Sequence, residues 1–161
     1  MPIPPIDNAK PNSYAFETTA LIKDTGFREY DARWWFGHAA SAKEPELNLI
    51  GVQRLEMELA TLARQSGNGP EIVTGHDFRS YSLSIKMALI SGLMAGGAHV
   101  KDIGLALSPM AYFAQFHLDA PSVAMVTASH NDNGWTGVKM ATKRPLTFGP
   151  DEMAALKRSA L

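Results

Sequence analysis

The sequence of 161 residues contains no cysteine, so a disulfide framework, a thiolate metal site and a cysteine nucleophile are all excluded. This absence fits a reducing compartment, and we expect a cytoplasmic protein. A surplus of positive charge is absent too. The formal net charge is -1, which argues against a general nucleic-acid binder.

Long apolar runs are also missing. The longest helical apolar stretch, residues 85–98, is interrupted by Lys86 and by glycines, so no segment is predicted to span a membrane. The N-terminus, Met-Pro-Ile-Pro-Pro, lacks a basic segment followed by an apolar block, so we expect no secretory signal. Hydrophobic residues make up 45% of the chain and charged residues 19%, which is the composition of a globular domain.

Strand-like and helix-like segments alternate from residue 47 on, which predicts a three-layer α/β/α domain with a mainly parallel, mixed sheet. Prolines crowd the start of the chain, so we expect residues 1–16 to form an extended arm and residues 17–161 to form the domain. Residues 27–33 fit either a hairpin arm or a loop, and residues 34–46 are expected to be irregular. The expected strands are 18–23, 71–75, 99–105, 121–126 and 137–141; the expected helices are 47–65, 81–95 (capped by Ser80 or Ser82), 108–117 (capped by Ser108) and one from 150.

Polar and glycine-rich residues replace apolar ones abruptly after residue 126. Residues 127–139, Thr-Ala-Ser-His-Asn-Asp-Asn-Gly-Trp-Thr-Gly-Val-Lys, combine a hydroxyl, an imidazole, amides and an ammonium with two glycines. Such a loop at the end of a buried strand is typical of a functional site. Residues 75–79 also follow a strand. Ligand sites of parallel sheets gather at the carboxyl ends of strands, so we expect both loops to share a face.

The adjacent pair Ser129 and His130 suggests a serine hydrolase, but two observations argue against it. Neighbours in an extended segment point to opposite sides, and the pattern Gly-x-Ser-x-Gly is absent around Ser129. Phosphoryl chemistry fits better, because a phosphoserine carries nearly two negative charges and needs backbone N–H groups and cations nearby. The candidate cations are Arg33, Arg79, His130 and Lys139.

Three segments resemble signatures of a single family. Residues 127–131, Thr-Ala-Ser-His-Asn, with Gly-Val-Lys at 137–139, resemble the active-site signature of the α-D-phosphohexomutases, the phosphoglucomutase/phosphomannomutase family. Residues 27–33, Phe-Arg-Glu-Tyr-Asp-Ala-Arg, resemble its N-terminal motif Phe-Arg-x-Tyr-Asp-x-Arg, and residues 75–79 resemble its Gly-x-Asp-x-Arg turn. The segments occur in the family's order. The resemblance therefore implies a domain I of phosphoglucomutase type.

The resemblance implies roles for six residues. Ser129 matches the serine that carries the phosphoryl group, and Lys139 matches the lysine proposed as general base or acid, although neutralising phosphate is an alternative role. Arg33 matches the arginine that holds the phosphate, for which a bidentate guanidinium is well suited. The remaining matches are His130, as proton carrier or orienting donor; Asn131, beside the serine; and Tyr30, for packing or substrate contact.

Other matches are weaker or depart from the pattern. Asp77 and Arg79 match the Gly-x-Asp-x-Arg turn, and we interpret them as mainly structural, through a helix cap or an ion pair. Three family positions differ here: Trp34 stands in place of glycine, Asp132 in place of proline and Thr136 in place of asparagine. The spacing from the serine to the lysine is kept, so we interpret these changes as a subgroup variant.

Family members have four domains, and the resemblance covers only the first. Nothing in the chain resembles the family's Mg²⁺-binding loop, Asp-Gly-Asp-x-Asp-Arg, so Ser129 would contribute to a Mg²⁺ site only through its phosphate. The other ligands are expected from the absent second domain. The resemblance also implies hexose phosphates as substrates, hexose 1,6-bisphosphate as activator and intermediate, the remaining domains as partners, and neither nucleic acid nor membrane.

The full-length enzyme is thus expected to interconvert hexose 6-phosphate and hexose 1-phosphate, with mannose, glucose or both as the sugar, and the fragment alone is expected to be inactive. Two alternatives stay open. The chain fits a non-catalytic α/β binding or assembly domain, and it fits a phosphoglucosamine mutase domain, because the groups that distinguish these sugars are recognised largely by the absent domains.

Overall fold

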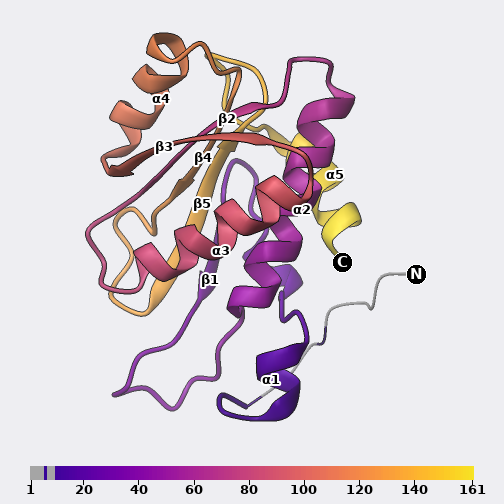
Figure 1. Cartoon of the computed structure of the whole chain (residues 1–161). Coiled ribbons are helices and arrows are strands. Elements are labelled where there is room, and N and C mark those ends of the chain that lie inside the picture. The colour runs from indigo at the N-terminus through magenta and orange to yellow at the C-terminus, as the bar shows by residue number, and fades with distance from the viewer. Residues whose placement is uncertain (1–5, 7–9) are drawn as a thin grey trace.

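The computed structural model describes residue 6 and residues 10–161. Its centre is a mixed sheet of five strands in the order β1-β5-β4-β2-β3 (Figure 1). Strand β2 runs parallel to β3 and β4, whereas β5 is antiparallel to β4 and β1 is antiparallel to β5. The strands are β1 (Ala32–Trp35), β2 (Glu71–His76), β3 (His99–Leu105), β4 (Ser122–Val126) and β5 (Trp135–Ala141).

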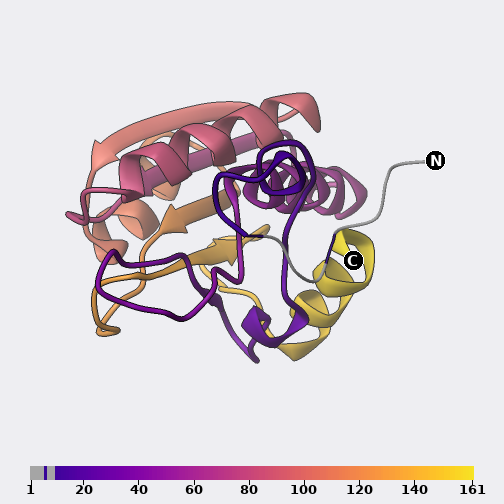
Figure 2. The same cartoon turned by 90° about the horizontal axis from the view of Figure 1, so that it is seen from below.

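Helices cover both faces of this sheet, which confirms the three-layer α/β/α fold (Figures 1 and 2). One core cluster joins α2, α3 and α5 to one face, and a second joins α4 to the opposite face. Apolar side chains on both sides remove β2, β4 and β5 from water, whereas edge strand β3 stays partly exposed. The long helices are α2 (Leu49–Gln65), α3 (Ser82–Ala95), α4 (Ser108–His117) and α5 (Pro150–Ala160).

Helix α2 forms because Val52, Leu55 and Leu59 recur at helical spacing and are fully buried. Asn48 is its N-cap: the side-chain Oδ1 accepts from Gly51 N at 2.7 Å and from Leu21 N at 3.0 Å. The predicted helix is confirmed, and its start lies two residues later than expected because Asn48 keeps an extended backbone.

The expectation of an extended arm up to residue 16 is wrong at its C-terminal end, because a short helix, α1 (Tyr14–Thr18), lies there. Ser13 nucleates it by accepting a hydrogen bond from Phe16 N. Residues 1–5 and 7–9 of that arm lie outside the described part. The strand expected at 18–23 is reduced to isolated bridges at Leu21 and Ile22, and a 3₁₀ turn (Asp24–Gly26) follows.

The prediction of an irregular segment over residues 34–46 is confirmed for residues 36–46 but wrong for Trp34 and Trp35, which belong to edge strand β1. The reason is tertiary. Trp34 is fully buried and pairs with Thr136 of β5, and its indole N–H donates to Lys23 O at 2.6 Å. Gly137 permits this pairing, since a Cβ there would lie 2.3 Å from Ala32 O.

The other predicted strands and helices are confirmed within one or two residues. Two capping expectations are wrong. Helix α3 has Tyr81 at its N-cap, without a side-chain hydrogen bond, because Ser82 bonds Asp77 instead. Ser108 is the first residue of α4 rather than its cap, because the chain stays extended through Leu107.

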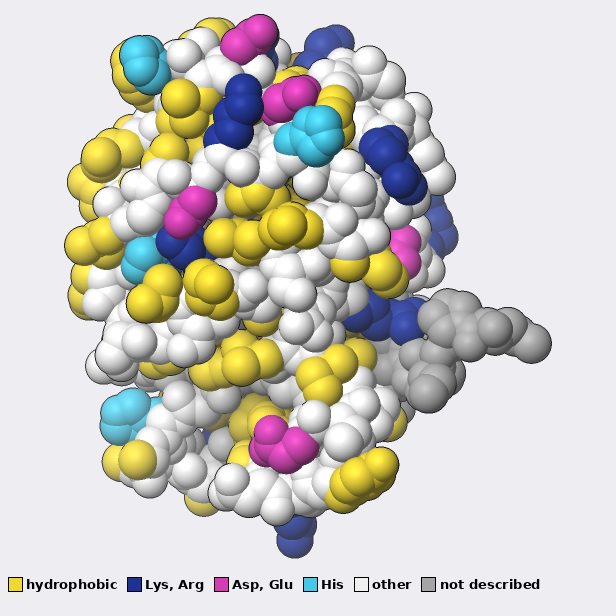
Figure 3. Space-filling view, in the orientation of Figure 1, with side chains coloured by type: hydrophobic (Ala, Val, Ile, Leu, Met, Phe, Trp, Pro, Cys, Tyr) yellow, Lys and Arg dark blue, Asp and Glu magenta, His cyan; other side chains and the backbone are white. Residues whose placement is uncertain are grey.

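Large apolar side chains are exposed along α4, at the end of β3 and just after β2 (Figure 3). They are 53% to 80% exposed and comprise Phe78, Leu105, Leu107, Met110, Phe113 and Phe116. We call this set the α4 apolar face. Among the residues described, none of the helices combines the length and the apolar character that a bilayer crossing needs.

Candidate functional site

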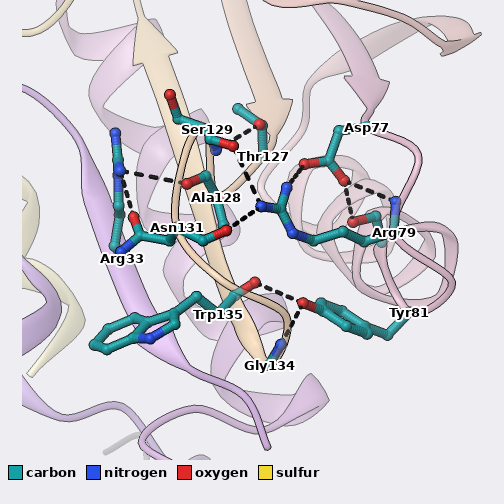
Figure 4. Close-up of polar contacts among 11 residues, drawn as sticks. Arg33, Asp77, Arg79, Tyr81, Thr127, Ala128, Ser129, Asn131, Gly134 and Trp135 are labelled. Carbon is teal, nitrogen blue, oxygen red and sulfur yellow. Dashed lines mark hydrogen bonds and ion pairs between the residues drawn. The ribbon is translucent and has the colours of Figure 1, made fainter. Parts of the chain in front are cut away.

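The loop between β4 and β5, residues 127–134, is called the serine loop here. It leaves the carboxyl end of β4 in a tight turn in which Asn131 N donates to Ala128 O at 3.0 Å. Ser129 has a φ of 54°, the left-handed conformation that is uncommon outside glycine. Its own amide donates to Thr127 Oγ1 at 2.9 Å (Figure 4). The turn leaves Ser129 and His130 exposed at the loop tip.

Arg33 binds one side of the serine loop through hydrogen bonds (Figure 4). Its Nη1 donates to Ala128 O at 3.3 Å and to Asn131 Oδ1 at 2.5 Å. The guanidinium is held by Asp31, whose Oδ2 accepts from Arg33 Nε at 3.1 Å and from Nη2 at 2.8 Å. The arginine is 8% exposed, so this charge-assisted pair is strongly oriented.

Arg79 grips the other side of the same loop (Figure 4). Its Nη2 donates to Asn131 O at 2.6 Å and to Ser129 O at 3.2 Å, and its Nη1 pairs with Asp77 Oδ2. Asp77 N donates to Val126 O at 3.0 Å, which ties the end of β2 to the end of β4. The expectation that the two strand-end loops share a face is therefore confirmed.

Asp77 holds the Arg79 side chain in place. Its Oδ1 accepts from Ser82 Oγ at 2.6 Å and from Arg79 N at 3.2 Å. Burial alone would raise the pKa of Asp77, but hydrogen bonds from Ser82, the Arg79 amide and Thr127, together with the Arg79 charge, bring that pKa below its ordinary value. The carboxylate is thus ionised at neutral pH. The ion pair expected between Asp77 and Arg79 is confirmed.

Lys139 lies on the Arg33 side, on β5. Its Nζ is 3.7 Å from Asp31 Oδ2, so one carboxylate faces both Arg33 and Lys139. The lysine side chain is 28% exposed, which leaves its ammonium accessible. Asn131, Arg33 and Lys139 therefore belong to one connected cluster, which Ser129 joins through its backbone carbonyl and Arg79.

Two predicted site residues lie outside this network. His130 is exposed at the loop tip, and its ring makes no hydrogen bond to any residue that the structure describes. Tyr30 is 59% exposed and has no such bond within the described chain either. The structure thus places His130 beside Ser129 but gives no contact between Tyr30 and the serine loop.

A cavity of about 420 Å³ opens beside Ser129. Polar groups of the serine loop and of the Arg79 side form one wall, and the residues between β3 and α4 form the other. The lining residues are Asp77, Phe78, Arg79, Ala106, Leu107, Ser108, Pro109, Met125, Thr127, Ser129 and His130. An open cavity with convergent polar groups is the usual form of a small-ligand site.

Sequence reasoning missed Asp31, Thr127 and Tyr81. The Tyr81 hydroxyl donates to Trp135 O at 2.8 Å and accepts from Gly134 N at 2.9 Å, so it closes the far end of the serine loop. Burial raises the pKa of Tyr81, which keeps that hydroxyl protonated. One signal was available for Asp31: both motifs contain Asp-x-Arg, at 31–33 and 77–79.

The three departures from the family pattern have simple environments. Trp34 fills the core, and its ring meets Phe27 edge-on at 5.2 Å between centroids. Asp132 is exposed and accepts a backbone bond from Trp135 N. Thr136 is buried, and its Oγ1 has no hydrogen-bond partner among the described residues. None of these side chains lines the cavity beside Ser129.

The described residues do not form a metal cage. No three His, Asp or Glu side chains within residues 6 and 10–161 come together in a way that could hold a metal ion. The exposed Ser129 hydroxyl could offer a metal only the oxygens of a phosphate attached to it. Further ligands for Mg²⁺ would have to come from outside the described residues.

Comparison with known proteins agrees with this geometry. Residues 25–161 match the family model described as "Phosphoglucomutase/phosphomannomutase, alpha/beta/alpha domain I". A relative from Xanthomonas campestris pv. campestris (strain B100), named "Phosphohexose mutases", is 43% identical over 125 residues, which cover 78% of this chain and 25% of the relative. One from Pyrococcus abyssi, named "Probable phosphoglucosamine mutase", is 40% identical over 91 residues, covering 56% of this chain and 20% of the relative.

A solved structure has the same fold. The crystal structure of a phosphoglucomutase/phosphomannomutase family protein from Burkholderia thailandensis superposes with a TM-score of 0.72 at 25% identity, covering 87% of this chain and 30% of that one. The chain therefore spans about a quarter of the length of the curated relatives above. Fold, site and sequence agree that the chain belongs to the phosphoglucomutase/phosphomannomutase family and is its α/β/α domain I.

Proposed function

We propose that this domain carries the phosphoserine of a phosphohexomutase, with Ser129 as the phosphoryl carrier. One observation supports this most: the exposed Ser129 hydroxyl projects from a left-handed turn whose backbone is held from both sides by buried arginines. A rigid, exposed hydroxyl beside an open cavity suits repeated donation and recovery of a phosphoryl group.

The proposed transfer balances as follows. The P–Oγ bond of phosphorylated Ser129 breaks, and a bond forms from that phosphorus to a hydroxyl oxygen of a hexose monophosphate. The proton of the sugar hydroxyl leaves to a base, which we assign to Lys139, while the departing Ser129 Oγ takes up a proton and becomes a free hydroxyl; the sugar becomes a hexose 1,6-bisphosphate. After the bisphosphate reorients in the site, the Ser129 hydroxyl attacks the other phosphorus and gives up its proton. The bond from that phosphorus to the sugar breaks, and the sugar oxygen takes the proton back from Lys139 to become the new hydroxyl.

Positive charge on the Arg33 side supports this assignment. Arg33 and Lys139 share the single carboxylate of Asp31, so the cluster has one more positive charge than negative charge once Lys139 has taken up the proton of the sugar hydroxyl. Phosphoryl transfer is catalysed mainly by positioning and by stabilising charge, which such a cluster provides. Asn131 orients Arg33, and His130 is assigned as an orienting donor or proton carrier at the loop tip. We assign Tyr30 to substrate contact.

Mg²⁺ would neutralise phosphate charge when bound, and this chain would hold it through the Ser129 phosphate alone. The other metal ligands are proposed to lie in a later domain of the same enzyme. We propose that this enzyme acts in the cytoplasm. The α4 apolar face supports this, because it borders the cavity beside Ser129, and an apolar surface of this kind usually marks a contact with another protein surface. We accordingly expect the isolated 161 residues to lack mutase activity.

The test is Ser129→Ala in the multidomain enzyme. We expect loss of mutase turnover and loss of phosphate from the peptide that contains residue 129, measured by mass spectrometry. Ser91→Ala, which changes an exposed serine of α3, is the matched control and should behave as wild type. Normal turnover by Ser129→Ala would show that the assignment is wrong and favour a non-catalytic binding or assembly domain.

Sugar choice is a second question. The Pyrococcus abyssi relative is named a probable phosphoglucosamine mutase, so glucosamine phosphate is the second candidate substrate beside mannose and glucose phosphates. Turnover of the three sugar 6-phosphates by the same preparation ranks them directly. A clear preference for glucosamine 6-phosphate would replace the mannose and glucose assignment without changing the role of Ser129.

A further inference from the structure

The serine loop is fixed by its carbonyl groups, which sequence motifs do not show. A single nitrogen, Arg79 Nη2, donates to the carbonyl oxygens of Ser129 and Asn131, at 3.2 and 2.6 Å. These carbonyls lie on either side of His130, so the bonds span the tip of the turn. Because both point toward Arg79, the Ser129 peptide cannot rotate without breaking a charge-assisted hydrogen bond.

Arg79 is itself immobilised. The residue is 7% exposed, and its Nη1 is paired with Asp77 Oδ2. Asp77 is fixed in turn by Ser82 Oγ at the start of α3 and by the backbone of β4. The guanidinium is therefore a rigid link between α3, the end of β2 and the serine loop.

The backbone of Ser129 needs such a link. A left-handed φ of 54° is unfavourable for a residue with a Cβ, and such a conformation persists only where the surroundings over-determine it. A lysine could keep the charge but not the planar fork that reaches Asp77 and two carbonyls at once. The contacts of Arg79 therefore hold the backbone that carries the Ser129 hydroxyl.

We propose that Arg79 is a positioning residue for phosphoryl transfer: it holds Ser129 in the left-handed conformation in which this residue lines the cavity. This inference rests on the proposed function of Ser129. It assigns no contact between Arg79 and the substrate. Loss of the fork lets the serine backbone relax, so the reacting oxygen is misplaced while the cations that bind phosphate on the Arg33 side remain.

The decisive comparison is Arg79→Lys against Lys86→Met in the multidomain enzyme. Lys86 is a matched control because it is also a buried cation paired with an aspartate, Asp102, at 2.6 Å, but it lies outside the cavity lining. We expect Arg79→Lys to lower kcat about 100-fold with an unchanged KM, the effect of a misplaced reacting group. Lys86→Met should lower Tm but leave kcat unchanged.

Two further readouts separate positioning from general destabilisation. In the isolated domain, hydrogen exchange of peptides covering residues 127–135 should quicken in Arg79→Lys and stay at the wild-type rate in Lys86→Met. In the multidomain enzyme, millimolar guanidinium should restore part of the kcat lost in Arg79→Ala, because the free ion can refill the site between Asp77 and the two carbonyls.

The inference is overturned if Arg79→Lys retains wild-type kcat and exchange, or if Lys86→Met loses as much kcat at temperatures well below its Tm. Failure of the proposed function gives a different result, since Ser129→Ala would then keep its turnover. If Ser129→Ala is inactive and Arg79→Lys is fully active, the positioning role of Arg79 is rejected and the proposed role of Ser129 stands.

Discussion

Two aspartate–arginine pairs hold the same loop, yet their surroundings differ. In each pair the arginine binds the aspartate two residues before it and donates to the backbone of the serine loop. Asp31 and Arg33 lie at the start of edge strand β1, and the carboxylate of Asp31 also faces Lys139. Asp77 and Arg79 are closed off by Ser82 of α3. Both pairs hold the loop, but only the first also contacts a partly exposed lysine, and we propose that this pair is the one that presents charge to a ligand.

The largest effect that tests this contrast is expected at Lys139, which only the first pair contacts. Lys139→Met should lower kcat roughly 1000-fold in the multidomain enzyme, as expected for loss of a general base, with little change in Tm because the ammonium is partly exposed. Steady-state kinetics and thermal unfolding check both values. Lys143→Met, which changes an exposed lysine just after β5, is the control. A similar loss of kcat in Lys143→Met would show that the effect is not specific to the lysine beside the Asp31–Arg33 pair.

A buried carboxylate without an arginine sharpens the comparison. Glu56 on α2 is fully buried, and neither of its oxygens has a hydrogen-bond partner among the described residues. Burial raises its pKa from 4.5 to about 8. Below pH 4.5 the Glu56 carboxyl is neutral in both the folded and the unfolded chain, so its burial carries no ionisation penalty. As the pH rises toward 8 the unfolded chain loses this proton first, and the free energy of unfolding falls by roughly 3 kcal/mol between pH 4.5 and 7.

The check is urea unfolding of the isolated domain from pH 5 to pH 8. Wild type should lose stability over this range, Glu56→Gln should lose much less, and Glu58→Gln on the same helix should follow wild type. An equal pH slope for wild type and Glu56→Gln would show that Glu56 does not titrate in this range.

A smaller effect with the opposite pH sign is expected at Asp77. Because the pKa of Asp77 is lowered in the folded state, its contribution is present above its ordinary pKa of 3.8 and is lost as the pH falls through the folded value. Asp77→Asn should cost about 2 kcal/mol at pH 7, through loss of hydrogen bonds to a charged group. The Tm of Asp77→Asn should change less between pH 5 and pH 3 than the Tm of the wild type. Parallel Tm curves would contradict the ionised role of Asp77.

The smallest effect should come from Ser82→Ala, which removes one hydrogen bond to Asp77 while leaving its pair with Arg79 intact. We expect a loss of about 1 kcal/mol in unfolding free energy and an unchanged KM. Ser84→Ala, at an exposed position of α3, should be neutral in the same assay. If Ser82→Ala lowers kcat as much as Arg79→Lys does, then the Asp77–Arg79 pair depends on the Ser82 hydrogen bond and is less rigid than its contacts indicate.

Local patterns predicted most of the fold because they depend on near neighbours. The apolar spacing of Val52, Leu55 and Leu59 was enough to place α2, and the apolar run before Thr127 was enough to place β4. The failures lie where distant partners override local preference. Trp34 and Trp35 form a strand because β5 pairs with them, and the serine near α3 turns to Asp77 instead of capping the helix.

Residue types at fixed local spacing were enough to predict the family, the serine loop and the cations that accompany it. Only the tertiary structure showed that Arg33 and Arg79 hold one loop from two sides. Arg33 is 95 positions from Ala128 and Arg79 is 50 positions from Ser129, so no local pattern relates them. Strand order brings them together: β1 reaches the loop through β5, and β2 reaches it through β4.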